Sequence, residues 1–447
     1  MAGSPSLEGN SEALYREMRG RVRAIFDHAL AECSIPRALQ HELKSDGRTL
    51  LVKDSIYDFT AFERVLVVSI GKAGCSLAEN FAGLVERTLE GIIAAPGAPP
   101  AQFAGFQHFS GGHPLPNEDS LRAGEAILRL VAGLSPETLV VFLISGGASA
   151  IAEKPIRAGI TLADVVQTYR ALVHSGAPIA EINAVRKHLS ALKGGRLARA
   201  AMPAYQLSIL VSDVPEHALD ALASGPTMPD STTVESCGDI ARRYQLLDRL
   251  PSTVRSIFEL GQLQETPKTG DAAFARSQYI TVLSNATAIK AAVEHAALAG
   301  FAVEVDNSCD DWDYARAADH LLRRLREIRQ GVSRACIISG GEVTVKVGAD
   351  SGVGGRNQQF ALYCGQKIAG ENITVLSAGT DGIDGNSEAA GAIVDGSTVE
   401  RATRQGLDAA AALAGFDSSP LFQAIGDAIM TGPTGNNVRD LRILLAY

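Results

Sequence analysis

The chain has 447 residues, of which 46% are hydrophobic and 5% are aromatic, and its formal net charge at pH 7 is -9. This length exceeds the usual size of one hydrophobic core and predicts two domains. The negative charge argues against a nucleic-acid-binding protein, which usually presents a basic face. The sequence contains no run of eighteen apolar residues, so no membrane span is expected. Six widely spaced cysteines without a Cys-x-x-Cys pair predict reduced thiols in a cytoplasmic protein.

A helix, and then a repeated pattern of strand, loop and helix, is predicted along the chain. Apolar residues at helical spacing predict the first helix over Ser11–Cys33. Later apolar runs, each followed by a loop of small or polar residues, predict strands at Val65–Ile70, Leu139–Ile144, Leu207–Val211 and Tyr279–Leu283. This alternation predicts an α/β fold with a mainly parallel sheet and flanking helices. In such folds, ligands bind at the carboxyl ends of the strands.

The domain junction is expected in the polar stretch 246–275, where the alternating pattern lapses. The predicted domains are therefore residues 1–255 and 256–447. Apolar residues within Val438–Tyr447 predict a last strand, which could pack back on the first domain.

Two loops in the first half suit an anionic ligand. Lys72 follows a predicted buried strand within Gly71-Lys72-Ala73-Gly74 and stands where a helix begins, so free N–H groups and a positive charge would coincide. Ser145-Gly146-Gly147-Ala148-Ser149 is a second loop able to surround an anion. A plain surface turn is the alternative for both loops. A serine nucleophile elbow is disfavoured, because Ile151 stands where that motif needs glycine.

A basic cluster follows in this acidic chain. Arg186, Lys187, Lys193 and Arg196 lie within a short, mainly helical region. A solvated basic face is one interpretation, and a pocket for an anionic substrate is the other.

Glycine-rich loops with charged groups follow two strand-like runs in the second half, Ile337–Ile338 and Ile373–Leu376. Arg356, preceded by two glycines, could bind a phosphate or carboxylate through two parallel hydrogen bonds. Asp381 and Asp384 are oxygen ligands of the kind that suits Mg²⁺, which completes its shell with waters and nucleotide phosphates. Stabilisation of the turns by these aspartates is the alternative.

Several nucleotide-binding signatures are absent from the sequence. It contains no Gly-x-x-x-x-Gly-Lys-Ser/Thr loop and no protein-kinase motif. No Gly-x-Gly-x-x-Gly follows a predicted strand, which weakens the hypothesis of a nicotinamide-dependent dehydrogenase.

The order of these loops resembles the glycerate 2-kinases that end in a MOFRL domain, a family often mislabelled as hydroxypyruvate reductases. The matching segments span nearly the whole chain: Gly71-Lys72-Ala73, Gly112-His113-Pro114-Leu115-Pro116, Ser145-Gly146-Gly147, Glu181-Ile182-Asn183, Arg186-Lys187-His188-Leu189-Ser190, Lys193-Gly194-Gly195-Arg196, Ser212-Asp213-Val214, Ala223-Ser224-Gly225-Pro226-Thr227, Gly340-Gly341-Glu342, Gly354-Gly355-Arg356-Asn357-Gln358, Gly379-Thr380-Asp381-Gly382-Ile383-Asp384-Gly385 and Thr431-Gly432-Pro433-Thr434-Gly435. The chain departs from the family pattern at Ala148, at Asn436 and at Pro215-Glu216-His217, where the last change removes an aspartate from a nucleotide or metal loop.

The resemblance implies an N-terminal Rossmann-like domain and a C-terminal MOFRL-type α/β domain. It implies ATP-dependent phosphorylation of D-glycerate at the C2 hydroxyl, giving 2-phosphoglycerate and ADP in the cleft between the domains. ATP, Mg²⁺ and the small acid are the expected partners, without nucleic acid or membrane, and a homodimer is left open. The alternatives are a kinase for a related small sugar acid, a hydroxypyruvate reductase, and a non-catalytic module that binds a sugar acid.

With this resemblance, each candidate residue receives an expected role. The expected catalytic residues are Lys72, Arg356 and Asp213. The expected substrate-binding residues are Ser145, Gly146, Gly147, Ser149, Arg186, Lys193 and Arg196. The expected nucleotide-binding residues are Gly71, Gly340, Gly341, Glu342, Gly354, Gly355, Asn357 and Thr380. The expected metal ligands are Asp381 and Asp384.

Overall fold

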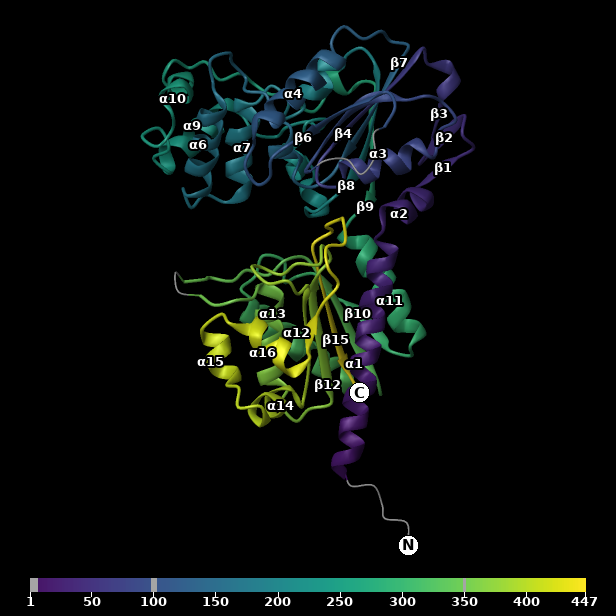
Figure 1. Ribbon diagram of the computed structural model, residues 1–447, viewed down its shortest axis with the longest axis vertical. Helices are drawn as coiled ribbons and strands as arrows, with labels where there is room; N and C mark the ends of the chain where they lie inside the picture. Colours follow the sequence, from purple (N-terminus) through teal and green to yellow (C-terminus); the bar gives the residue numbers. More distant parts are fainter. Residues whose placement is uncertain (1–6, 98–102, 349–350) are drawn as a thin grey trace. The chain divides into compact units, whose positions relative to one another are not determined.

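The computed structural model describes residues 7–97, 103–348 and 351–447 and contains two compact units (Figure 1). The parallel-sheet unit comprises Ile35–Val282. The mixed-sheet unit comprises Met1–Ser34 together with Leu283–Tyr447. Within the described residues, no helix is both long and apolar enough to cross a membrane.

The parallel-sheet unit contains a small antiparallel sheet, a large sheet and flanking helices. Its strands are β1 (Leu43–Ser45), β2 (Thr49–Val52), β3 (Ser55–Asp58), β4 (Arg64–Ile70), β5 (Glu90–Ala95), β6 (Phe106–Ser110), β7 (Thr138–Ile144), β8 (Tyr205–Val211) and β9 (Ser277–Leu283). Its helices are α2 (Ile35–Glu42), α3 (Gly74–Ala82), α4 (Glu118–Leu130), α5 (Ala148–Ile151), α6 (Leu162–Val173), α7 (Ile179–Leu189), α8 (Arg196–Ala200), α9 (Val234–Arg243) and α10 (Ser252–Glu259), with 3₁₀ turns η1 (Phe59–Ala61), η2 (Glu216–Ser224) and η3 (Ala272–Phe274).

The large sheet has the strand order β6-β5-β4-β7-β8-β9, and the pairings of β6 with β5, β5 with β4, β4 with β7 and β7 with β8 are parallel. Every residue of β7 is buried, as expected for a strand covered by helices on both faces. The prediction of a mainly parallel α/β sheet is confirmed. From the adjacent strands β4 and β7, the order of the strands runs outward in opposite directions, so the switch point of the sheet lies between these two strands. In doubly wound sheets, ligands bind at such a switch point.

The mixed-sheet unit is also an α/β structure. Its strands are β10 (Ala302–Val305), β11 (Ala335–Gly340), β12 (Ile373–Gly379), β13 (Gly391–Asp395), β14 (Ala428–Ile429) and β15 (Asp440–Ala446). Its helices are α1 (Leu7–Glu32), α11 (Asn285–Leu298), α12 (Tyr314–Arg329), α13 (Arg356–Lys367), α14 (Thr398–Arg404), α15 (Ala409–Ala414) and α16 (Ser418–Ile425).

The six strands of the mixed sheet have the order β10-β11-β15-β12-β13-β14. Strand β15 is antiparallel to both neighbours, β11 and β12, so the carboxyl ends of β11 and β12 lie at the same edge as the start of β15. Side chains alternate between two cores: Ile337, Val375 and Leu444 face the core of α12 and α13, whereas Ile338, Leu376 and Ile443 face the core of α1 and α11.

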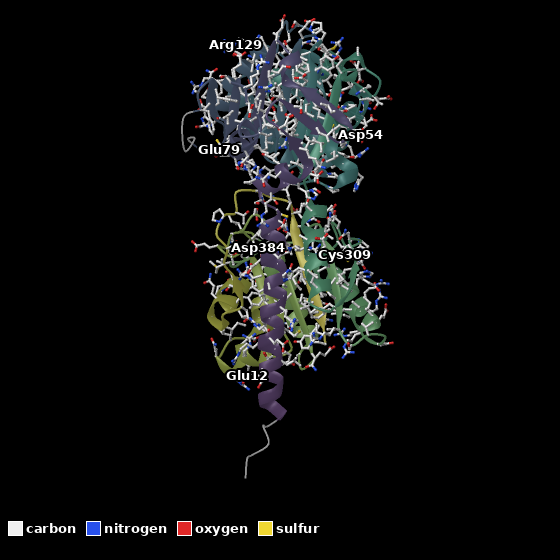
Figure 2. The ribbon with its side chains drawn as sticks, turned by 90° about the vertical axis from the view of Figure 1, so that its right-hand side faces the viewer. Glu12, Asp54, Glu79, Arg129, Cys309 and Asp384 are labelled. Atoms are coloured by element: carbon white, nitrogen blue, oxygen red, sulfur yellow. The ribbon has the colours of Figure 1, made fainter. Side chains whose placement is uncertain are left out.

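The observed units differ from the predicted ranges 1–255 and 256–447. Helix α1 packs on α11 and the mixed sheet through Met18, Val22 and Phe26, so the start of the chain belongs with its C-terminal part (Figure 2 labels Glu12 on this helix). Strand β9 joins the parallel sheet, which moves the junction to Val282. Strand β15 is fully buried in the middle of the mixed sheet and does not return to the parallel sheet.

Candidate active site

The loops after β4 and β7 meet at the switch point of the parallel sheet. The Lys72 N–H donates to the Gly146 carbonyl over 2.9 Å, and the Ala73 N–H donates to Ser145 Oγ over 3.0 Å. Gly71 has a φ of +128°, and a Cβ there would overlap Ser145, so only glycine fits. Ser145 is therefore buried and links the two loops through its hydroxyl group. Lys72 is exposed and lies where the two loops meet.

Three polar side chains lie next to the glycines after β7. A Cβ on Gly146 would collide with the Asp213 carboxylate, which follows β8. A Cβ on Gly147 would lie 3.0 Å from His113 Cδ2 and 3.1 Å from Lys72 Cγ. Lys72 and Asp213, two predicted catalytic residues, thus both lie against this loop.

His113 was not among the candidate residues drawn from the sequence, although it stands in the motif that begins at Gly112. Burial, and then the charge of the nearby Lys72, lower the pKa of His113 below its ordinary value. The imidazole is therefore neutral at pH 7 and can donate or accept a hydrogen bond there.

A pocket of about 310 Å³ opens beside this loop. Its lining residues are His113, Pro114, Leu115, Gly147, Ser149, Ala150, Tyr169, Arg170, Val173, His174 and Arg186. Two arginines and two histidines are among the described residues that line it, and no carboxylate is. Ser149 Oγ lies 2.8 Å from Ser224 Oγ, which helps to fix the serine at the pocket wall. The pocket is complementary to a small anion.

Arg186 provides the most buried cation of this pocket. Its guanidinium carbon lies 4.2 Å from the ring centroid of Tyr169. Its Nε is buried and has no hydrogen-bond partner among the described residues. Burial lowers the pKa of Arg186, while the nearby Tyr169 and Glu153 act to raise it.

Lys193 and Arg196 do not line the pocket. Lys193 is 1% exposed, forms an ion pair with Glu153 and donates to Tyr169 Oη over 2.6 Å. Arg196 begins α8, and one of its terminal nitrogens donates to the Gln264 carbonyl over 2.7 Å. Protein partners already engage both cations. Because Lys193 is buried, a solvated basic face does not describe this cluster either.

Arg356 is held between carboxylates at the edge of the mixed sheet. Its Nε donates to Asp440 Oδ2 over 2.6 Å, and one terminal nitrogen lies 3.1 Å from Asp440 Oδ1 and 2.9 Å from Glu342 Oε1. Burial acts to lower the pKa of Arg356, but the hydrogen bond and charge of Asp440 raise it above its ordinary value. Asp440 was not predicted; it is the first residue of β15, where it pairs with Gly379 at the end of β12.

Asp384 is the acceptor at the start of α13. Its carboxylate accepts the backbone N–H groups of Asn357 and Gln358 over 3.0 and 2.8 Å, and the side-chain amides of the same two residues lie 3.3 and 3.2 Å away. A Cβ on Gly355 would collide with this carboxylate. The loop glycine therefore admits Asp384, and the anion at the helix N-terminus is a side chain of the protein itself. Burial raises the pKa of Asp384 to about 6 despite these hydrogen bonds.

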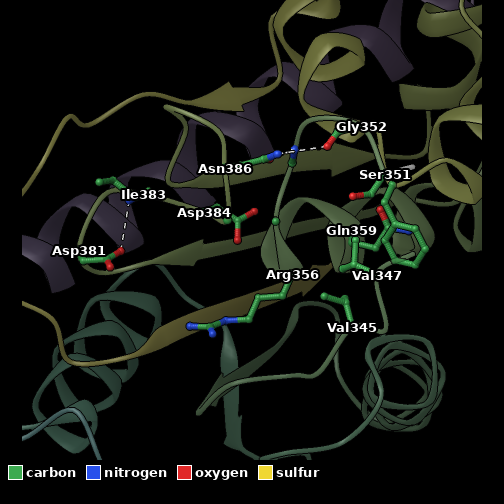
Figure 3. Close-up of a pocket in the computed structure, with 14 residues that line it drawn as sticks. Val345, Val347, Ser351, Gly352, Arg356, Gln359, Asp381, Ile383, Asp384 and Asn386 are labelled. Atoms are coloured by element: carbon green, nitrogen blue, oxygen red, sulfur yellow. Dashed lines mark hydrogen bonds between the residues drawn. The ribbon is translucent and has the colours of Figure 1, made fainter. Parts of the chain in front are cut away.

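A second pocket, of about 460 Å³, lies beside the start of α13 (Figure 3). Its lining residues are Val345, Val347, Ser351, Gly352, Gly354, Gly355, Arg356, Gln359, Asp381, Ile383, Asp384, Gly385, Asn386 and Phe416. Asp381 is half-buried, and its Oδ1 accepts the Ile383 N–H over 3.2 Å. Charged groups thus line this pocket together with apolar side chains such as Val345, Val347 and Phe416.

The other predicted nucleotide-binding residues have structural hydrogen bonds. The N–H groups of Gly340 and Gly341 donate to the side chains of Asn307 and Asn285 over 2.9 and 3.0 Å. Thr380 is buried, and its hydroxyl donates to the Arg439 carbonyl over 2.7 Å. None of these three described residues is among those that line the pocket.

Mg²⁺ was predicted to bind at Asp381 and Asp384. In the part of the chain that the structure describes, no three His, Cys, Asp or Glu side chains form a metal-binding group. Both aspartates line the pocket, but the Asp384 carboxylate already accepts hydrogen bonds from Asn357 and Gln358. One carboxylate fits Mg²⁺ when nucleotide phosphates and waters complete the shell, so Asp381 is the residue that would hold the ion.

Comparison with known proteins covers both units. Residues 21–259 match a domain of unknown function, DUF4147, and residues 335–440 match the MOFRL family. A relative from Agrobacterium vitis, provisionally named a hydroxypyruvate reductase, is 35% identical over 98% of this chain and 97% of its own. The D-glycerate 2-kinase of Thermotoga maritima is 36% identical over 85% of this chain and 90% of its own. The crystal structure of glycerate kinase from Thermotoga maritima superposes with a TM-score of 0.84 and 31% identity, over 97% of this chain and 100% of the other.

The α/β architecture, with its anion-compatible pocket at the switch point, and these matches define a kinase. More specifically, the chain belongs to the glycerate kinase family with a C-terminal MOFRL region.

Proposed function

We propose that this protein transfers the γ-phosphoryl group of ATP to the C2 hydroxyl of D-glycerate, giving 2-phosphoglycerate and ADP. The observation that carries the proposal is the 310 Å³ pocket at the switch point, which is lined by Arg170 and Arg186 and by no described carboxylate. A pocket of this size lies at the small end of the usual range for ligand sites and suits a small acid. The name of the 36% identical relative, a D-glycerate 2-kinase, supports the choice of acceptor and position.

In the parallel-sheet unit, Arg186 would bind the glycerate carboxylate and Ser149 a hydroxyl group. Asp213 would orient the C2 hydroxyl and accept its proton as the oxygen bonds to the γ-phosphorus. The bond from that phosphorus to the bridging oxygen of ADP breaks in the same step. Lys72 would stabilise the charge on the transferred group, since phosphoryl transfer depends mainly on positioning and electrostatic stabilisation.

In the mixed-sheet unit, Arg356 would bind nucleotide phosphates, and the apolar lining at Val345, Val347 and Phe416 would contact the base. Arg356 must then exchange part of its bonding to Glu342 and Asp440 for a phosphate. Mg²⁺ bound at Asp381 would neutralise phosphate charge. The roles of Gly71, Gly354 and Asn357 in nucleotide binding, and a catalytic cleft shared by the two domains, stay predictions.

Phosphorus NMR tests the proposal directly. Purified protein is incubated with Mg²⁺-ATP and D-glycerate, and the product is compared with added 2-phosphoglycerate and 3-phosphoglycerate. A 2-phosphoglycerate signal supports the assignment, and a 3-phosphoglycerate signal refutes the position of transfer. If neither appears, a screen of related small sugar acids follows, because the altered loop at Pro215–His217 bears on acceptor choice.

The name of the Agrobacterium vitis relative motivates a second candidate, reduction of hydroxypyruvate. Loss of NADH absorbance in the presence of hydroxypyruvate would support it. The absence of a dinucleotide fingerprint from the sequence disfavours it. A non-catalytic sugar-acid-binding module would instead show stabilisation by D-glycerate without turnover of ATP.

A further inference from the structure

Three buried polar residues beside the acceptor pocket have no part in the proposed chemistry. Glu153, Tyr169 and Lys193 are each less than 5% exposed. The Tyr169 hydroxyl donates to Glu153 Oε2 over 2.6 Å and accepts from Lys193 Nζ over 2.6 Å, while Lys193 also forms an ion pair with Glu153. The second Glu153 oxygen accepts from Ser190 Oγ over 2.6 Å and from the Lys154 N–H over 2.8 Å. The tyrosine hydroxyl is therefore fixed from two sides.

A buried ion pair is weak evidence for stability, because the cost of removing two charges from water can exceed their attraction. The position of this pair suggests a different use. Burial, and then the charge of Glu153, raise the pKa of Tyr169 well above its ordinary value, so the phenol keeps its proton and its donor role. The pair thus holds one neutral ring in one orientation.

The Tyr169 ring that this pair holds is in contact with Arg186. Its guanidinium lies 4.2 Å from the centroid of the Tyr169 ring, and both side chains line the acceptor pocket. A guanidinium stacked on a ring keeps its N–H donors in its own plane, where they can engage a carboxylate. Arg186 has a buried Nε without a partner among the described residues, so a donor remains for a ligand.

We propose that Tyr169 is a positioning residue for the acceptor: its ring holds Arg186 in place at the pocket, and the Glu153–Lys193 pair holds the ring. Lys193, expected from the sequence to bind substrate, thereby acts through Tyr169 and not by contact with the acid. The inference rests on the proposed function, in which Arg186 binds the glycerate carboxylate. According to this inference, Tyr169 affects the affinity of the protein for the acid and does not affect its affinity for ATP.

Steady-state kinetics of Tyr169→Leu, with Tyr169→Phe as the matched control, test the inference. Removal of the ring takes away the cation–π contact that holds Arg186 and should raise KM for D-glycerate about tenfold. The kcat and the KM for ATP should stay within about twofold. Tyr169→Phe keeps the ring but loses the hydroxyl that the ion pair holds, so it should raise the same KM by a smaller factor of about threefold. Tyr169→Met replaces Tyr169→Leu if the latter does not fold.

The double variant with Arg186→Gln separates positioning from a merely structural role. Once Arg186 is gone, Tyr169→Leu should raise KM for D-glycerate no further, because the ring acts through the arginine. Independent, additive effects of the two changes would overturn the inference, as would an unchanged KM in folded Tyr169→Leu.

The proposed function can fail separately from this inference. Its failure would be evident in the wild-type protein as absence of 2-phosphoglycerate. Calorimetric titration of the same variants with inorganic phosphate then takes the place of kinetics. A tenfold weaker affinity in Tyr169→Leu, but not in Tyr169→Phe, would support the positioning role, and equal affinities would refute it.

Discussion

Replacement of Asp384 distinguishes a helix cap from a metal ligand. In Asp384→Ala, the backbone N–H groups of Asn357 and Gln358 lose their acceptor inside the protein. Each buried donor left unpaired costs about 1–3 kcal/mol, so with two donors the mixed-sheet unit should lose about 2–6 kcal/mol of unfolding free energy. Asp384→Asn keeps one acceptor oxygen and should lose about half as much.

The pH dependence of this loss has a defined sign. The pKa of Asp384 is raised to about 6 from 3.8, chiefly by burial. Because the carboxyl pKa is higher in the folded state than in the unfolded state, the protonated form of Asp384 stabilises the folded protein at low pH. This stabilisation is lost as the pH rises through 6, since the folded protein then holds a carboxylate that burial disfavours. Asn does not titrate. The deficit of Asp384→Asn relative to wild type should therefore be larger at pH 5 than at pH 7, by about 1 kcal/mol or more.

Urea unfolding followed by circular dichroism at both pH values measures these differences, with the Mg²⁺ dependence of turnover recorded in parallel. If Asp384 is a helix cap, its variants should lose stability, and the variant molecules that remain folded should need the same Mg²⁺ concentration as the wild type. An Asp384→Asn protein of wild-type stability that needs far more Mg²⁺ would refute this reasoning and restore the role of metal ligand. A deficit that grows toward pH 7 would refute the assigned sign of the pKa shift.

Three further changes test the proposed site. In Arg356→Ala, kcat should fall on the order of 10³-fold through loss of charge stabilisation, and near-normal turnover of the folded variant would remove Arg356 from the mechanism. Lys72→Met should cause a similar fall in kcat with little change in Tm, because Lys72 is exposed; a large drop in Tm with retained kcat would indicate a structural role. Gly146→Ala should lower kcat at least tenfold by displacing the Asp213 carboxylate, whereas Gly20→Ala, whose Cβ meets open space on a helix, should leave kcat unchanged and serve as the control. Equal kinetics of the two alanine variants would contradict the placement of Asp213.

Much of the architecture follows from the sequence alone. Apolar runs that alternate with helical segments determine a parallel α/β sheet, because only helices on both faces can bury strands such as β7 completely. The loops at Lys72 and Ser145 could be placed at one edge for the same reason, since the carboxyl ends of parallel strands lie together. Order and spacing of the loops also indicated the family that comparison with known proteins shows.

Only the tertiary structure decided which partners these residues have. Helix α1 and the last strand β15 both belong to the mixed-sheet unit, although hundreds of residues separate them, because hydrophobic burial and strand pairing depend on spatial complementarity and not on sequence distance. The same limit applies to charges. Asp384 accepts helix N–H groups, and Lys193 pairs with Glu153 inside the protein. Arg186, in contrast, lines a pocket and has an Nε without a hydrogen-bond partner among the described residues. A charged residue in a sequence shows what it can bind, but the groups packed around it determine what it does bind.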